Sequence, residues 1–186
     1  MIRTRPLWRT GVDALVFLSV LVLVLVALQK FGALDIQQGN VRVIDGDSLR
    51  DGQTEIRLHG IDAPEYRQTC LDEFRKSYPC GKRATEELRG LVAAGEVKCR
   101  SLEVDRYGRA VATCWVNGFD LAQAMVERGW AVAFTQFGTD YLLTEIKAHK
   151  AKRGLWAGSF EPPAEYRKRL RNVQSDVAGA ERVEPD

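Results

Sequence analysis

Hydrophobic and polar residues alternate in short runs through the middle of the chain, and the runs end at turn-forming residues. The alternation from Val41 to Leu49 predicts β-structure, and Asp51-Gly52 is typical of a tight hairpin turn. Residues 54–61 continue the alternation, so they are predicted to form the second strand of that hairpin. Further strands are predicted over residues 96–104 and 110–116.

Helical spacing of apolar residues follows the strands. Ala84, Leu88 and Leu91 lie on one face of a helix, and glycines follow the predicted ends of all three helices. Strands followed by helices, without regular β-α-β alternation, predict an α+β protein. We expect a small five-stranded β-barrel of the oligonucleotide-binding (OB) fold with three α-helices. The predicted helices cover residues 81–94, 120–128 and about 140–153.

The N-terminal part of the chain has a different composition. An apolar run over residues 14–28, interrupted by Ser19 alone, follows three arginines, which is typical of an export signal. We expect residues 1–34 to form a transmembrane signal anchor in preference to a cleaved signal peptide, and residues 35–39 to form a connector. Basic residues before the apolar run stay in the cytoplasm, so the rest is expected outside it, at the cell membrane or secreted.

The charge of the chain gives no general argument for nucleic-acid binding. Four of the 27 basic residues and one of the 25 acidic residues precede residue 35, so the remaining part is close to neutral. Residues 40–157 are predicted to form one folded domain. Residues 158–186 are expected to be a loosely ordered basic tail, and its cluster Arg167, Lys168, Arg169 and Arg171 is either a phosphate tether or a disordered segment.

Four cysteines lie beyond the apolar run. An even number in an exported domain indicates disulfides, and the spacing favours pairing Cys70 with Cys80 and Cys99 with Cys114. A zinc site is the competing interpretation, although the chain contains no C-x-x-C pair.

The residues that could carry chemistry fall in two segments. The first, residues 45–65, contains DGDS followed by RLHGIDAPE, and the second is DRYGR at residues 105–109. Carboxylates in the first segment supply hard oxygen ligands for a divalent cation, and arginines in both can bind a phosphate through paired hydrogen bonds. If these groups converge, they form a metal-assisted phosphoryl site.

In this order, the three motifs resemble those of the staphylococcal nuclease (thermonuclease) family over about residues 40–156. The resemblance implies a calcium-dependent endonuclease that hydrolyses DNA and RNA at the P–O5′ bond and leaves 3′-phosphate ends. It implies attack by an activated water, with single-stranded substrates preferred. The membrane contact comes from the N-terminal segment, and no protein partner is implied.

The resemblance also implies a role for each matching residue. Asp47, Asp62 and the Ala63 carbonyl correspond to calcium ligands, with Asp45 beside them, and Glu65 corresponds to the general base. The remaining positions divide into those that bind the scissile phosphate, Arg57 and Arg109, and those that contact the nucleotide, Arg106, Tyr107 and Phe134. Phe134 replaces a tyrosine of the family pattern and keeps a stacking face without the hydroxyl.

Two other functions are compatible with the sequence. A catalytically silent OB-fold module could bind single-stranded nucleic acid through the same face, although such a relative is expected to lose the carboxylates and arginines that are present here. A disulfide-linked adaptor for protein partners would need none of them.

Overall fold

The computed structural model of the chain describes residues 15–24, 35–37, 41–135 and 138–180, and for 35–37 and 176–180 it describes the backbone alone. The chain forms two compact units, Met1–Asp35 and Ile36–Asp186. Beyond residue 34, the described elements are β1 (Asp35–Gln37), β2 (Arg42–Val43), β3 (Ser48–Asp51), β4 (Thr54–Leu58), β5 (Ile61–Asp62), β6 (Cys70–Leu71), β7 (Ser77–Tyr78), α2 (Cys80–Val92), β8 (Val97–Val104), β9 (Ala110–Val116), β10 (Phe119–Asp120), α3 (Leu121–Glu127), β11 (Val132–Ala133), α4 (Leu142–Lys150), the 3-10 helix η1 (Gly154–Ala157) and α5 (Pro163–Ala180).

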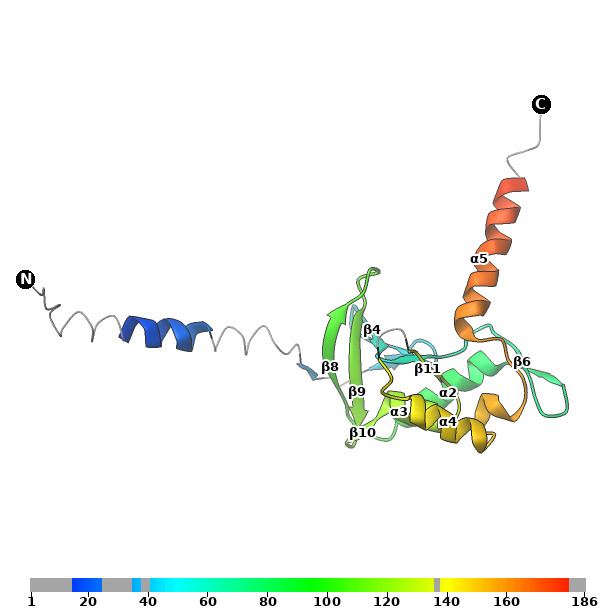
Figure 1. Cartoon of the computed structure of the whole chain (residues 1–186), viewed down its shortest axis with the longest axis horizontal. Coiled ribbons are helices and arrows are strands. Elements are labelled where there is room, and N and C mark those ends of the chain that lie inside the picture. The colour runs from blue at the N-terminus through cyan, green and yellow to red at the C-terminus, as the bar shows by residue number, and fades with distance from the viewer. Residues whose placement is uncertain (1–14, 25–34, 38–40, 136–137, 181–186) are drawn as a thin grey trace, which may run out of the picture. The chain divides into compact units, whose positions relative to one another are not determined.

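The main sheet joins two hairpins. Its strand order is β1-β8-β9-β4-β3-β2, with β10 paired to β9 (Figure 1). β3 and β4 form the predicted hairpin around Gly52, whose φ of 52° suits a glycine in a tight turn. β4 pairs in parallel with β9, with Arg57 opposite Val111. This pairing brings the strand that carries Arg57 next to the strand that begins after Arg109.

Helices cover one face of this sheet. In β9, alternate residues Ala110, Ala112, Cys114 and Val116 are buried, as the predicted alternation requires. They join a core that includes Ile56, Leu88 and Met125 from β4, α2 and α3. Burying a side chain as large as Ile56 or Leu88 completely stabilises the fold by about 1.5–3 kcal/mol.

The predicted α+β class is confirmed, and the three predicted helices correspond to α2, α3 and α4. Asp120 caps α3 by accepting a hydrogen bond from the Gln123 amide, as expected for an aspartate at this position. The main sheet contains seven strands among the described residues, where five were expected, because the short strands β1 and β10 add to the predicted ones. The predicted connector at residues 35–39 is therefore partly wrong, since residues 35–37 form β1; residues 38 and 39 lie outside the described part.

Both favoured disulfides are present, Cys70–Cys80 and Cys99–Cys114, so all four cysteines are paired and none is left for zinc. Cys99 and Cys114 lie directly opposite each other in the β8–β9 hairpin. The segment between residues 66 and 79 contains the small β6–β7 hairpin. Its Leu71 also pairs with Ser159, which links this hairpin to the segment before α5.

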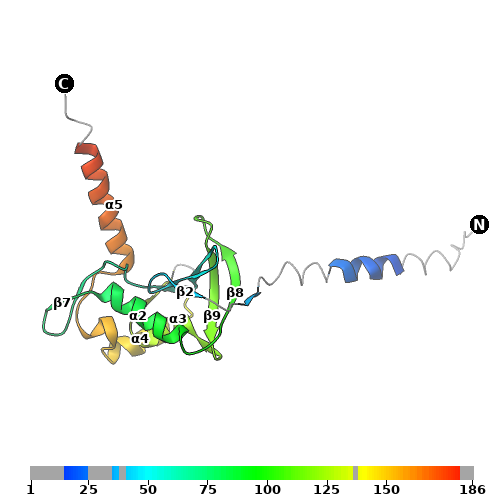
Figure 2. The ribbon, with the colours of Figure 1, turned by 180° about the vertical axis from the view of Figure 1, so that it is seen from behind.

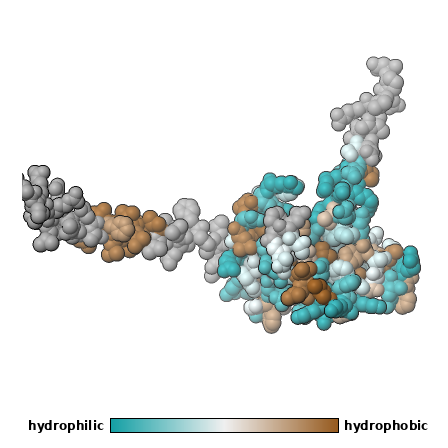
Figure 3. All heavy atoms as spheres, viewed as in Figure 1, coloured by the Kyte–Doolittle hydropathy of each residue, from teal (hydrophilic) through white to brown (hydrophobic). Residues whose placement is uncertain are grey.

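The expected disordered tail is a helix in this structure. α5 (Pro163–Ala180) begins at Pro163, a residue that suits the first turn of a helix because its missing N–H would have no partner there (Figures 1 and 2). Figure 3 shows mainly hydrophilic residues along the first half of α5. The prediction of a loosely ordered segment is therefore corrected for the first turns of α5, which contact the domain through Arg167.

At the N-terminus, residues 15–24 form a helix with exposed apolar side chains. Among the residues that the structure describes, no helix combines the length and apolar character needed to cross a membrane. The other parts of the predicted anchor, residues 1–14 and 25–34, lie outside the described residues.

Candidate active site

Two buried carboxylates from different elements lie at the centre of the site. Asp47 precedes β3 directly and is 3% exposed, whereas Asp62 ends β5 and is 1% exposed. Two buried carboxylates in one place are costly unless cations or hydrogen bonds neutralise them. The surrounding groups must therefore supply positive charge.

Arg57 supplies part of this charge by bridging the two carboxylates. Its Nη1 donates to Oδ1 of Asp47 over 3.2 Å, and its Nη2 donates to Oδ1 of Asp62 over 2.9 Å. The β3–β4 register, in which Ser48 pairs with Arg57, places the guanidinium next to Asp47. Burial opposes the charge of Arg57, but the two carboxylates outweigh burial and raise its pKa above the ordinary value.

Asp47 is fixed by three further hydrogen-bonding groups in the fold. Its Oδ1 accepts from the Ser48 hydroxyl, its Oδ2 accepts from the Ala63 amide over 2.9 Å, and its own amide donates to Asp45. Burial raises the pKa of Asp47 to about 7, although Arg57 partly offsets this effect. The Ala63 contact joins the first half of the site to the end of β5.

Glu65 occupies the loop that follows β5, and its backbone is tightly held. Its amide donates to the side chain of Gln68, and its carbonyl accepts from the Gln68 amide over 2.7 Å. Gly81 in α2 packs against the same carbonyl, so closely that a Cβ there would overlap it. The Glu65 side chain remains 36% exposed, so its carboxylate is accessible from solvent.

Arg167 contacts the carboxylates of the site, although the sequence did not place it there. Its Nη1 donates to Oδ1 of Asp62 and to Oε1 of Glu65, each over 2.9 Å, and its Nη2 donates to Oδ2 of Asp62 over 2.8 Å. Burial opposes its charge, but Asp62 and Glu65 outweigh burial and raise the pKa of Arg167 above the ordinary value. The only sequence signal for it was the basic cluster in the predicted tail.

Arg109 lies directly before the neighbouring strand β9 and has different partners. Its Nε donates to Oδ2 of Asp105 over 2.8 Å, and its Nη1 is 3.9 Å from Oε1 of Glu55. Asp105 also accepts from the amides of Tyr107 and Arg109, so one carboxylate orders the whole turn. The turn presents Tyr107, which is 69% exposed, with the Arg106 guanidinium 4.9 Å from its ring centroid. An exposed aromatic ring next to a cation suits stacking on a nucleotide base.

The backbone of Phe134 lies next to the segment that carries Asp62. It follows β11, which pairs with β5 so that Val132 is opposite Asp62. The Phe134 amide donates to the Gly60 carbonyl over 2.9 Å, which fixes this segment beside the strand that carries Asp62.

No group of three or more His, Cys, Asp or Glu side chains is arranged to hold a metal ion in the described part of the chain. The donor set nevertheless suits a hard divalent cation, since Asp47 and Asp62 are two buried carboxylates bridged by one guanidinium. Calcium or magnesium sites of this kind are completed by backbone carbonyls and water. Arginine currently contacts both carboxylates.

Comparisons with known proteins agree with this geometry. The model of the staphylococcal nuclease homologue family matches residues 55–158, more than half of the chain. The chain is 34% identical to an uncharacterized endonuclease of Escherichia coli over 136 residues, which are 69% of this chain and 82% of that protein. It is 32% identical to the probable staphylococcal-like nuclease CAN1 of Oryza sativa subsp. japonica over 130 residues, or 68% of this chain and 36% of that protein.

A third relative has a different kind of name. Over 96 residues the chain is 38% identical to the succinoglycan biosynthesis protein ExoI of Rhizobium meliloti (strain 1021), covering 50% of each protein. The chain thus spans half the length of that relative and about a third of the rice protein.

Proposed function

Since the chain belongs to the staphylococcal nuclease family, we propose that it is an endonuclease that hydrolyses phosphodiester bonds in DNA and RNA. The observation that carries this proposal is the Asp47–Arg57–Asp62 bridge, with Glu65 joined to Asp62 through Arg167. Carboxylates able to bind a cation, a carboxylate able to take a proton and guanidinium groups able to bind phosphate are thus within one hydrogen-bonded network.

In this proposal calcium binds to Asp47, Asp62 and the Ala63 carbonyl, with Asp45 nearby. When bound, the cation polarises a phosphoryl oxygen as a Lewis acid. The carboxylates face arginine in the structure, so a cation must share or replace those contacts.

The residues of the chain supply the remaining chemistry. Glu65 accepts a proton from a water molecule as its oxygen attacks phosphorus, which can contribute about 100-fold or more to the rate. The P–O5′ bond breaks, and the leaving 5′ oxygen takes a proton from solvent water, which gives a 5′-hydroxyl and a 3′-phosphate. Arg57 and Arg109 bind the phosphate and stabilise the charge that develops on its oxygens.

Nucleotide contacts are assigned to the β8–β9 turn and to the segment after β11. Arg106, Tyr107 and Phe134 would position the bases on either side of the cleaved bond. Stacking on exposed rings favours unpaired bases, so single-stranded substrates are expected to be cleaved preferentially.

We place the nuclease domain outside the cytoplasm, attached to the membrane through the N-terminal segment or released from it. The two disulfides support this proposal, because such bonds persist mainly in oxidising compartments. The basic and apolar N-terminal sequence supports it independently.

The test is digestion of end-labelled single-stranded DNA by the full chain, with calcium and with a chelator. Cleavage in calcium, loss of cleavage in chelator and phosphatase-sensitive 3′ ends are expected. Arg57→Lys should lower turnover at least tenfold, because lysine cannot donate to two groups in parallel. Arg50→Lys, an exposed arginine on β3 that pairs with Glu55, is the matched control.

Three results would change the proposal. Cleavage that persists in chelator would remove calcium from the mechanism. Binding of the DNA without cleavage would favour the catalytically silent module. An absence of both binding and cleavage would leave the adaptor for protein partners as the better hypothesis.

A further inference from the structure

We propose that Arg167 of α5 is a third phosphate-binding arginine of this active site, in addition to Arg57 and Arg109. This inference rests on the proposed nuclease function and adds a residue from a segment that the family match, residues 55–158, does not cover.

Arg167 and Arg57 contact the same carboxylate, that of Asp62. Both guanidinium groups donate to the same atom, Oδ1 of Asp62, and both do so over 2.9 Å. Arg57 continues to Asp47 on one side, and Arg167 continues to Glu65 on the other. The two arginines therefore both contact the Asp62 carboxylate, Arg57 through one oxygen and Arg167 through two, and a phosphate held by Arg57 beside Asp62 is within reach of Arg167.

Arg167 also lies next to Glu65, where the reacting phosphate is expected. The proposed base accepts a proton from a water that is attacking the phosphate, so the phosphate must lie close to Glu65. Nη1 of Arg167 is already 2.9 Å from Oε1 of Glu65. A guanidinium suits this place because it binds phosphate oxygens in pairs and keeps its charge at any working pH. With 30% of its side chain exposed, Arg167 is also open to a substrate.

The fold also holds the start of α5 beside Glu65. The side chain of Gln68, which is fully buried, accepts from the Glu65 amide and donates to the Glu161 carbonyl over 2.7 Å. Arg169 in turn donates to both carboxylate oxygens of Glu161. The buried Gln68 thus connects the loop that carries Glu65 to Glu161, which lies two residues before α5.

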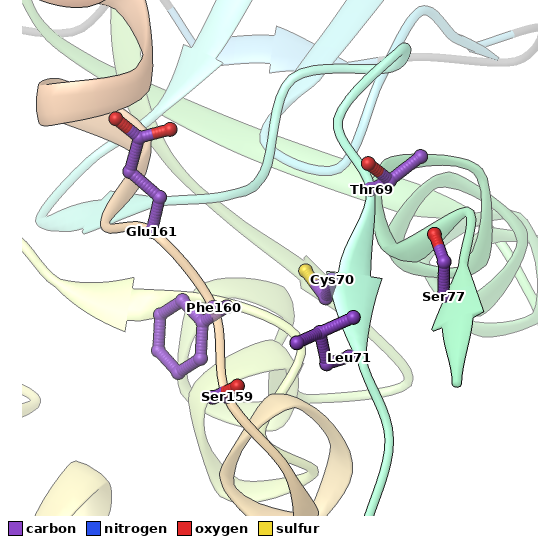
Figure 4. A pocket seen from close by; sticks show the side chains of 7 residues that line it. All are labelled: Thr69, Cys70, Leu71, Ser77, Ser159, Phe160 and Glu161. Atoms are coloured by element: carbon purple, nitrogen blue, oxygen red, sulfur yellow. The ribbon is translucent and has the colours of Figure 1, made fainter. Parts of the chain in front are cut away.

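Residues that follow Gln68 and residues that precede α5 line a pocket next to this contact. An open pocket of about 250 Å³ separates Glu161 from Thr69 and Ser77, and Cys70 and Phe160 line it (Figure 4). The Leu71–Ser159 bridge joins its two sides, and the Cys70–Cys80 disulfide links Cys70 to the start of α2. Arg167 therefore lies on a helix whose start is held against the domain, unlike a charged residue on a disordered tail.

The experiment compares Arg167→Ala and Arg167→Lys with the wild-type full chain at saturating calcium, measuring kcat, KM and calcium affinity by calorimetry. We expect kcat/KM to fall at least about tenfold in Arg167→Ala, with partial recovery in Arg167→Lys. Added guanidinium ion at low millimolar concentration should restore part of the turnover of Arg167→Ala and leave the wild type unchanged. Calcium affinity should not fall, because a positive charge has been removed beside Asp62.

Arg171→Ala is the matched control, since it removes an exposed arginine from the same helix. Its kcat/KM should stay within about twofold of the wild type. Unchanged kcat/KM in Arg167→Ala would overturn the inference, because Arg167 would then be a spectator. Higher activity of Arg167→Ala at low calcium, with wild-type activity at saturating calcium, would also overturn it, because Arg167 would then only compete with the cation.

The wild type separates this inference from the function on which it rests. An inactive wild type would refute the proposed nuclease function. An active wild type whose turnover depends on Arg57 but not on Arg167 would refute the inference alone.

Discussion

Glu65 and Arg167 lie 102 positions apart in the sequence, yet Nη1 of Arg167 donates to Oε1 of Glu65 over 2.9 Å. The contact orients the carboxylate that the nuclease proposal uses as a base. Because Arg167 also binds Asp62, the orientation of Glu65 is tied to that of the carboxylate at the end of β5. Substitutions at Glu65 should therefore change catalysis far more than folding.

Replacing Glu65 with glutamine is expected to lower kcat about 100-fold or more, because the amide cannot accept a proton from water. The amide oxygen can still accept a hydrogen bond from Arg167, so the melting temperature should change by a few degrees at most. Turnover of single-stranded DNA in calcium and thermal unfolding by circular dichroism are the measurements. Glu86→Gln, at an exposed position of α2, is the control. Near-wild-type turnover of Glu65→Gln would show that another group is the base.

Gly81 and Gly90 lie in the same helix, but only Gly81 touches the Glu65 loop. A Cβ at Gly81 would overlap the carbonyl of Glu65, whereas a Cβ at Gly90 would meet nothing within 4 Å. Gly81→Ala is expected to destabilise the protein by about 1–3 kcal/mol through overpacking and to lower turnover by moving Glu65.

The control substitution should have the opposite effect on stability. Gly90→Ala removes the flexibility of an exposed helical glycine, so it should stabilise the protein by about 0.5–1 kcal/mol with unchanged turnover. Both effects can be measured by urea unfolding. Equal stabilities of the two variants would contradict the close packing of α2 on the Glu65 loop.

Local sequence patterns predicted much of this fold because they depend on neighbouring residues. The alternation in β9 and the spacing of Ala84 and Leu88 in α2 each follow from one buried face. The favoured cysteine pairs were also predictable, since Cys99 and Cys114 are equally distant from one turn. The short strands β1 and β10 were not, because two or three residues carry no periodicity.

The sequence placed the motif residues of the candidate site but not Arg167, because local patterns do not report contacts between distant parts of the chain. Residues in the motifs, such as Asp47 and Asp62, could be assigned from their order in the chain. The contact of Arg167 depends on the path of the chain through Gln68 and Glu161, and no local pattern reports that path. The basic cluster around Arg167 gave a correct signal of charge, but its composition alone also fits a disordered tail.

The two disulfides should contribute to different properties. The Cys70–Cys80 bond closes a loop of ten positions between the Glu65 segment and α2, and removing it is expected to cost about 2–4 kcal/mol. The double variant Cys70→Ala/Cys80→Ala should also lose turnover, because the Gly81 amide next to Cys80 donates to the Gln68 carbonyl, and Gln68 in turn holds the segment before α5. Melting temperature and kcat are the measurements.

The Cys99–Cys114 bond provides the matched comparison, since it crosses a hairpin whose strands are already paired. Its removal should lower the melting temperature with kcat within about threefold of the wild type. If both double variants lost the same fraction of kcat, the proposed role of the Cys70–Cys80 loop would be wrong.

Asp105 should make the stability of the Arg109 turn depend on pH. Burial alone would raise the pKa of Asp105, but hydrogen bonds from Arg109 and Tyr107 outweigh burial and lower it. The folded state thus favours the carboxylate, so its stabilisation is complete above the unfolded pKa of about 3.9 and is lost as pH falls through the lower folded value. Asp105→Asn should therefore melt a few degrees below the wild type at pH 6, with the difference shrinking toward pH 2.5. Glu103→Gln, exposed in the same hairpin, should show no such trend; a pH-independent difference for Asp105→Asn would refute the assignment.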